Sequence, residues 1–103
     1  MDKYDARIYM ADFESRIEEA LKKWKHITKI ENGGSTQFEW QFEDARIIVD
    51  VFWGMNKDRI KLTCYSPTID WKHEWDGLTK ETTTKAMDRI GNFAQIIQSK
   101  HHK

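Results

Sequence analysis

The chain of 103 residues has little of several things that would narrow its chemistry. It has one cysteine, Cys64, so no internal disulfide is available, and one proline, Pro67. It has no Asn-x-Ser/Thr acceptor site, no apolar run long enough to cross a bilayer, and no secretory pattern in its first residues. We therefore expect a cytoplasmic protein with no membrane partner.

Net charge is also absent, because 17 basic and 17 acidic side chains cancel. Neutrality removes the simplest argument for a nucleic-acid or membrane partner, so a charged partner must be met by a local patch. What the chain does have is 39% hydrophobic residues, including five Trp, five Phe and three Tyr. That supply is typical of a folded chain, and the length favours a single domain over residues 1–103.

Apolar spacings of three and four predict an N-terminal helix over about residues 5–26. The stripe consists of Ala6, Met10, Phe13, Ile17, Ala20, Leu21, Trp24 and Ile27. Tyr4, Ala6, Ile8 and Met10 also alternate as in a strand, so helix, strand and arm all stay open for residues 1–11. A second stripe predicts a helix over about 80–99, with Thr79 as its cap. Gly91 at its flank indicates close helix packing.

The middle of the chain alternates apolar and polar residues, which predicts half-buried strands over 36–42, 47–53, 60–64 and 69–75. A weaker pattern allows a short strand over 27–31. The turns are expected at 32–35, 44–45, 54–57 and 66–67, with Pro67 widening the last loop.

Hairpins that close symmetrically about these turns predict a specific pairing of the strands. The apolar face then has three rows: Phe42, Ile47, Cys64 and Ile69; Trp40, Val49, Leu62 and Trp71; and Phe38, Val51, Ile60 and His73. On the other face, Glu39 and Asp50 share a row with Lys61 and Lys72.

These elements predict an α+β two-layer sandwich: an N-terminal helix, an antiparallel meander of four or five strands, and a C-terminal helix, with both helices on one sheet face. The element order resembles that of the frataxin-type sandwich. Frataxins gather acidic residues along the first helix and the adjoining strand, whereas here Lys22, Lys23 and Lys25 offset Glu18 and Glu19. The resemblance therefore brings no iron-binding function with it.

No catalytic residue, metal ligand set or cofactor motif is predicted, and we expect a protein that is not an enzyme. His73 lies on the apolar face without a second ligand nearby, and Cys64 is expected in the core. The row that joins Glu39 and Asp50 to lysines favours a solvated charge ladder over a catalytic carboxylate pair. Gly33-Gly34 lacks the lysine of a phosphate loop and is interpreted as a hairpin turn.

The face opposite the helices is the candidate binding surface. Its predicted binding residues are Arg46, Ile48, Phe52, Arg59, Lys61 and Tyr65. Pairing places Phe52 opposite Arg59 and Arg46 opposite Tyr65, and aromatic residues among arginines are typical of interface centres. An N-terminal arm or loop that covers this patch is the structural alternative.

The leading hypothesis is an intracellular module that docks a protein partner, as an inhibitor, adaptor or regulatory protein does. Short Trp-rich proteins of this kind are common among phage accessory and toxin-neutralising proteins. The alternative is a single-stranded nucleic-acid-binding domain in which Phe52 and Tyr65 stack bases and basic residues follow the backbone. Acidic residues on the same face oppose that alternative. The oligomeric state stays open.

Overall fold

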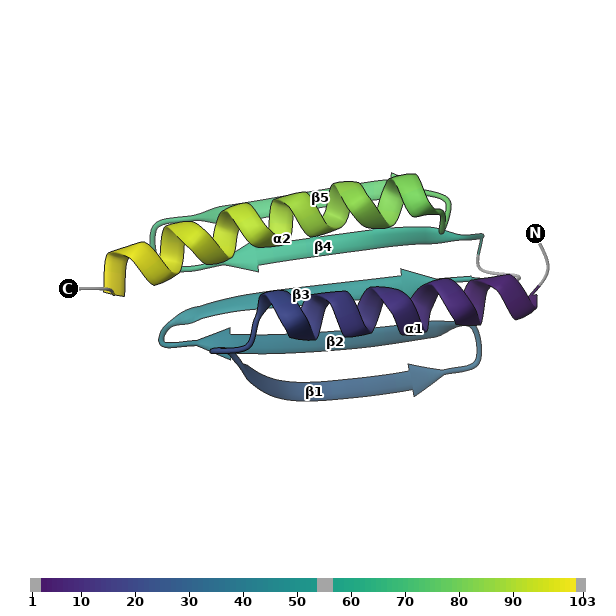
Figure 1. The fold of residues 1–103 in the computed structure, drawn as a ribbon, viewed down its shortest axis with the longest axis horizontal. Helices are drawn as coiled ribbons and strands as arrows, with labels where there is room; N and C mark the ends of the chain where they lie inside the picture. The colour runs from purple at the N-terminus through teal and green to yellow at the C-terminus, as the bar shows by residue number, and fades with distance from the viewer. Residues whose placement is uncertain (1–2, 54–56, 102–103) are drawn as a thin grey trace.

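The computed structural model describes residues 3–53 and 57–101, and the side chains within 8–53 and 57–100. Over these residues the chain forms an N-terminal helix, five strands and a C-terminal helix, as Figure 1 shows. They are α1 (Lys3–Ala20), β1 (Lys25–Asn32), β2 (Ser35–Phe42), β3 (Ala45–Phe52), β4 (Arg59–Tyr65), β5 (Asp70–Asp76) and α2 (Lys80–His101). The strands form one antiparallel sheet in chain order, which confirms the predicted α+β architecture.

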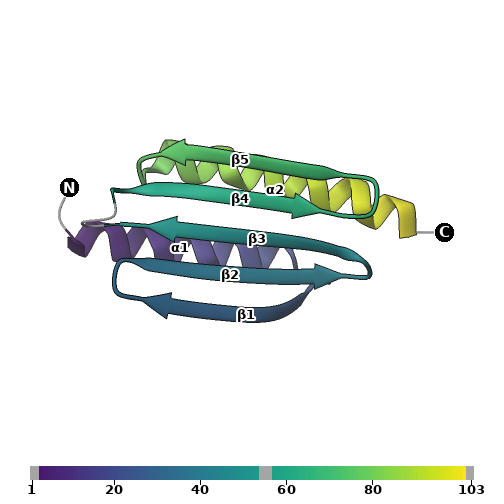
Figure 2. The same cartoon turned by 180° about the vertical axis from the view of Figure 1, so that it is seen from behind.

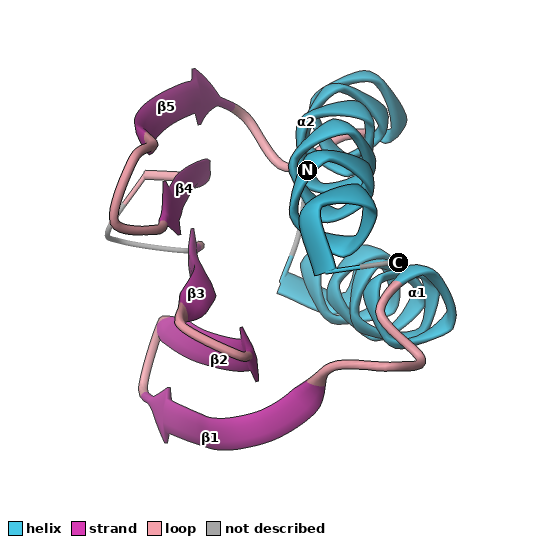
Figure 3. Ribbon diagram, turned by 90° about the vertical axis from the view of Figure 1, so that its left-hand side faces the viewer, coloured by secondary structure: helices cyan, strands magenta, loops and turns pink. Residues whose placement is uncertain are grey.

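The two helices lie side by side on the same face of the sheet (Figure 3). The apolar core fills the space between these layers and includes Phe13 and Ile17 of α1 and Ile90 and Phe93 of α2, all fully buried. Seen from behind, the five strands lie in front of both helices (Figure 2), and no described element covers that face. The sheet therefore has an inner face under the helices and an open face.

The N-terminal helix is shorter than its apolar stripe. α1 ends at Ala20, whereas the periodicity predicted a helix to residue 26. Leu21 and Trp24 are still buried because they form a tight turn into β1, in which the Trp24 amide donates to the Leu21 carbonyl at 3.0 Å. Ile27 belongs to β1, beside a bulge, and is 41% exposed. The weakly predicted strand at 27–31 is thus a full strand of eight residues.

The turn between β2 and β3 lies one residue earlier than the sequence predicted. Glu43 and Asp44 form it, with Glu43 at a positive φ of 55°, and Ala45 is the first residue of β3, fully buried opposite Phe42. The expected turn at 44–45 would have placed Ala45 outside the core. Moving a hairpin turn by one residue moves the pairing by two, so the predicted β2–β3 register was wrong although each residue keeps its face.

The turn between β4 and β5 lies one residue later than the sequence predicted, at Pro67 and Thr68. Ser66 and Ile69 exchange backbone hydrogen bonds of 2.8 and 3.3 Å around Pro67 and Thr68. The Ser66 hydroxyl also accepts from the amides of Thr68 and Ile69. Proline suits the second position of such a turn because its φ is already near −65°, so Pro67 does not widen the loop. This pairing is likewise two residues away from the predicted one.

The β3–β4 register agrees with the prediction, because Val49 pairs with Leu62 and Ile47 with Cys64. With the other two turns corrected, the inner face has four rows. They run Phe42, Ala45, Ser66 and Ile69; Trp40, Ile47, Cys64 and Trp71; Phe38, Val49, Leu62 and His73; and Thr36, Val51, Ile60 and Trp75.

Helix α2 begins where its cap was predicted. The Thr79 hydroxyl accepts from the Thr82 amide at 3.1 Å, and the Thr82 hydroxyl accepts from the Thr79 amide at 3.0 Å. This reciprocal arrangement is a capping box in which threonine replaces the usual glutamate, and it satisfies amides that the first turn leaves without helical partners.

Candidate binding face

The open face has side chains in four rows across the five strands. The rows run Lys25, Gln41, Arg46, Tyr65 and Asp70; Thr28, Glu39, Ile48, Thr63 and Lys72; Ile30, Gln37, Asp50, Lys61 and Glu74; and Asn32, Ser35, Phe52, Arg59 and Asp76. Asp50 and Lys61 are cross-strand neighbours as predicted. Glu39 lies opposite Ile48, so the expected row of Glu39, Asp50, Lys61 and Lys72 was wrong.

Charges of both signs alternate over this face. The cationic residues are Lys25, Arg46, Arg59, Lys61 and Lys72, and the acidic ones are Glu39, Asp50, Asp70, Glu74 and Asp76. Arg46 lies 3.4 Å from Glu39, and Arg59 lies 3.6 Å from Glu74. The two arginines therefore already have carboxylate neighbours within the sheet, and the face as a whole has no excess of positive charge.

One end of the open face has an exposed aromatic residue in a hollow. Tyr65 is 50% exposed and lies opposite Arg46, with Ile48 in the next row. The hollow has a volume of about 610 Å³. Its lining residues are Gln41, Asp44, Arg46, Ile48, Thr63, Tyr65, Asp70 and Lys72. We call this the Tyr65 hollow; its lining combines apolar side chains with hydrogen-bond donors and acceptors.

At the other end of the open face, Arg59 covers the aromatic ring of Phe52. The Arg59 guanidinium lies over the Phe52 ring at 4.4 Å from its centroid, and both residues are partly buried. A cation over an aromatic face is attracted by the ring quadrupole, so Arg59 occupies the ring face that Phe52 would otherwise present to a ligand. Phe52 is therefore not free to stack on a partner.

The predicted binding residues are consequently separated into two groups. Tyr65 and Phe52 lie in the first and fourth rows, about 20 Å apart at ~3.3 Å per residue. Arg46 and Ile48 belong with Tyr65, Arg59 belongs with Phe52, and Lys61 lies between the groups beside Asp50. The six predicted binding residues therefore do not form one patch, because Phe52 is four residues from Ile48 along β3.

Gln41 lines the Tyr65 hollow but was not among the predicted binding residues. Gln41 reaches it only because the β2–β3 turn lies at Glu43–Asp44, which brings Gln41 opposite Arg46. By its residue type Ala45 fits either the turn or the inner-face alternation of Ile47 and Val49, and only its burial shows that β3 begins there.

Cys64 and His73 lie on the inner face, and packing explains the position of both. Cys64 is fully buried, and burial raises the pKa of its thiol to about 12. His73 is partly buried opposite Leu62, and its ring stacks on Trp75 at 5.6 Å. Within the described residues, no three side chains of the metal-binding types come together.

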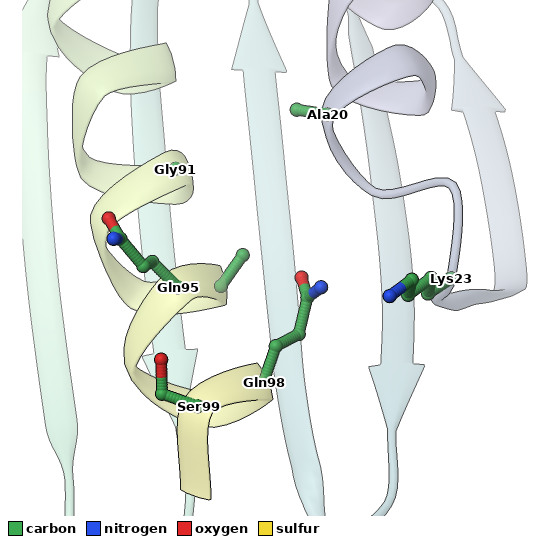
Figure 4. A pocket seen from close by; sticks show the side chains of 7 residues that line it. Ala20, Lys23, Gly91, Gln95, Gln98 and Ser99 are labelled. Carbon is green, nitrogen blue, oxygen red and sulfur yellow. The ribbon is translucent and has the colours of Figure 1, made fainter. Parts of the chain in front are cut away.

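A smaller hollow, of about 340 Å³, lies between the helices and contains Gly91 (Figure 4). Ala20 and Lys23 lie on one side of it and Gln95, Gln98 and Ser99 of α2 on the other. A Cβ atom added to Gly91 would meet nothing within 4 Å. The expectation that Gly91 permits close helix packing was therefore wrong.

Comparisons with protein-family models, with curated proteins and with solved structures found no match. The likeness to frataxins is thus one of element order. Over the residues described, each helix is too short or too polar to cross a membrane.

Proposed function

We propose that this chain is a small binding module that docks a protein partner through the Tyr65 end of its open sheet face, in the manner of an inhibitor, adaptor or regulatory protein. The observation that carries the proposal is the 50% exposure of Tyr65 inside a hollow shared with Arg46 and Ile48. Tyrosine and arginine are enriched among the residues that dominate binding energy, and an aliphatic neighbour supplies apolar contact.

Charge favours a protein over a nucleic acid as the partner. Phosphate backbones are held by an excess of Lys and Arg, whereas acidic residues occur in every row of this face. Asp70 lies opposite Tyr65, and Glu39 lies 3.4 Å from Arg46. Phe52, the second aromatic residue that would stack a base, is already covered by Arg59.

Binding of the partner to single-residue variants tests the proposal. The partner is identified by quantitative affinity capture from the cells that naturally make the chain, and its affinity is then measured with purified proteins. Tyr65→Ala and Arg46→Ala should each weaken binding by about thirtyfold, the loss expected for a residue of this class. The melting temperature should barely move, because both side chains are exposed.

Two control variants locate the site. Phe52→Ala alters the far end of the same face, and Asp88→Ala alters the exposed surface of α2. Both should leave affinity within about threefold of the unchanged chain. Normal binding by Tyr65→Ala, with loss in Asp88→Ala, would move the site to the helices and refute the proposal. Salt-sensitive oligonucleotide binding that Arg46→Ala weakens would instead support the nucleic-acid alternative.

A further inference from the structure

Strand β5 forms one edge of the sheet, with β4 as its only neighbour among the described strands. The Ser66–Ile69 pair exchanges both backbone hydrogen bonds, and such pairs alternate with non-bonded ones along an antiparallel ladder. Trp71, His73 and Trp75 therefore direct their backbone groups toward β4. The N–H and C=O groups of Asp70, Lys72, Glu74 and Asp76 point outward, where another strand would pair with them.

The sequence of β5 is almost the same in both directions. It reads Asp-Trp-Lys-His-Glu-Trp-Asp over 70–76, with His73 at its centre. An antiparallel strand related by a two-fold axis at His73 would place Lys72 opposite Glu74 and Trp71 opposite Trp75. A strand that reads alike both ways, with opposite charges exchanged across the centre, is complementary to a second copy of itself.

The inner face at this edge also has room for a second copy. A hollow of about 610 Å³ lies between β5 and α2, lined by Trp71, Asn92, Gln95, Ile96 and Ser99. Ile96 is 36% exposed there, and both tryptophans of β5 are only partly buried. In the symmetric pairing, Trp75 of the second copy lies opposite Trp71 and would enter this apolar hollow.

We propose that two copies of the chain associate through β5, which pairs antiparallel with β5 of the second copy about a two-fold axis at His73. The product is one continuous sheet of ten strands with four helices on its inner side. Lys72 and Glu74 of each copy exchange main-chain hydrogen bonds with Glu74 and Lys72 of the other. The proposal concerns the sheet edge and does not depend on the function of the open face.

The symmetry of the sequence favours this register over its neighbours. A shift by two residues, which keeps every side chain on its face, places either Lys72 against Lys72 or Glu74 against Glu74 on the axis, and both shifts separate Trp71 from Trp75 of the other copy. The shift that centres on Glu74 also pairs Lys72 with Asp76, and the double charge variant described below distinguishes it. In the symmetric register the like charges, Asp70 and Asp76, meet only at the ends of the strand. Arg59 lies directly across from Asp76 in the register of each copy, although its ion pair is with Glu74 at 3.6 Å.

Sedimentation equilibrium over a wide concentration range tests the proposal with the unchanged chain and two charge variants. The unchanged chain should show a monomer–dimer equilibrium. Lys72→Glu replaces two attractive cross-strand pairs by two repulsive ones, because the axis duplicates each pair. We expect it to weaken the dimer by at least about tenfold.

The double variant Lys72→Glu/Glu74→Lys tests the register of the strand pairing. It exchanges the two charges, restores opposite charge across the axis, and should return the dissociation constant to within about threefold of the original. Lys85→Glu on exposed α2 is the control for net charge and should not weaken the dimer. Circular dichroism verifies that each variant folds.

Three results would overturn the proposal. A chain that remains monomeric up to about 1 mM, where even weak specific complexes form, has no such interface. A dimer that is indifferent to Lys72→Glu uses another surface. A dimer that the single variant weakens and the double variant does not restore uses another register. Because Lys72 also lines the Tyr65 hollow, these outcomes are measured as the oligomeric state of the chain alone, without the partner of the open face.

Discussion

Leu62 lies in the middle of the inner face, between Val49 and His73, and is 1% exposed. Truncation of such a side chain removes buried apolar area and leaves a cavity that close-packed neighbours fill only in part. Leu62→Ala should therefore lower the free energy of unfolding by about 2–5 kcal/mol, measured by urea denaturation. A loss below about 1 kcal/mol would place Leu62 outside the core.

Cys64 gives the fold a dependence on alkaline pH. Burial raises the pKa of its thiol from the ordinary value of 9.0 to about 12, so in that interval the folded chain retains a proton that the unfolded chain has lost. The contribution of Cys64 to stability is therefore complete below about pH 9 and decreases as the pH rises toward 12.

Urea midpoints at about pH 8 and about pH 10 test this for the unchanged chain and for Cys64→Ala. Both chains share the titration of their other groups, so the difference between their declines isolates the thiol. The unchanged chain should lose more stability than Cys64→Ala. Equal declines would mean that Cys64 is not buried as a neutral thiol.

Gly91 and Gly77 make a matched pair. Gly91 lies in the interior of α2, where a Cβ atom meets nothing within 4 Å, so Gly91→Ala should raise the unfolding free energy by about 0.5–1 kcal/mol through the helix propensity of alanine. Gly77 has a φ of 94°, which a residue with a Cβ atom rarely adopts, and Gly77→Ala should therefore lower the free energy of unfolding by about 1–2 kcal/mol. Destabilisation by Gly91→Ala in thermal unfolding would show that this position is crowded after all.

At the scale of the elements, the sequence predicted which residues face the core better than which residues pair. Alternation decides the face of a strand, and it placed Trp40, Val49 and Cys64 inward as observed. Pairing depends on the turn, where one residue of error moves the register by two. Ala45 and Pro67 each fit two turn positions by composition alone, and only tertiary burial and the Ser66 hydrogen bonds distinguish them.

The end of α1 was missed for a related reason. Leu21 and Trp24 continue the helical spacing, yet they are buried from a turn, because the core needs their side chains and not a helical backbone. Trp24 packs against Phe42 and Phe93, and its indole donates to Gln98 at 3.1 Å. Such contacts with distant residues cannot be inferred from local periodicity.

The open face as an element should tolerate loss of its charge ladder. Asp50 and Lys61 are cross-strand neighbours. The Asp50 carboxylate also accepts a hydrogen bond of 2.8 Å from the side-chain amide of Gln37. Replacing both by alanine should cost only about 0.2–1 kcal/mol for the pair, because Lys61 is exposed and solvent screens its attraction to the half-buried Asp50. Thermal unfolding measures this. Collapse of the double variant would mean that the inner and outer faces are assigned the wrong way round.

At the scale of the whole molecule, the layer arrangement was predictable because the supply of apolar faces leaves few alternatives. Two amphipathic helices and one sheet with a single apolar face form two layers (Figure 3), and in the described part of the chain no helix is left to cover the second sheet face. The binding surface was predictable only in part. Its residue types were visible in the alternation, whereas the separation of Phe52 from Tyr65 and the hollow around Tyr65 depend on the register.

Site-specific photo-crosslinking in the cells that naturally make the chain tests whether the open face docks a protein. A photoreactive amino acid replaces Tyr65 of β4 in one variant and Asp88 of α2 in another. Both positions are exposed, and α2 lies on the sheet face opposite the open one (Figure 3). We expect a discrete protein adduct, distinct in mass from two copies of the chain, from position 65 and none from position 88. Adducts from position 88 alone would contradict it.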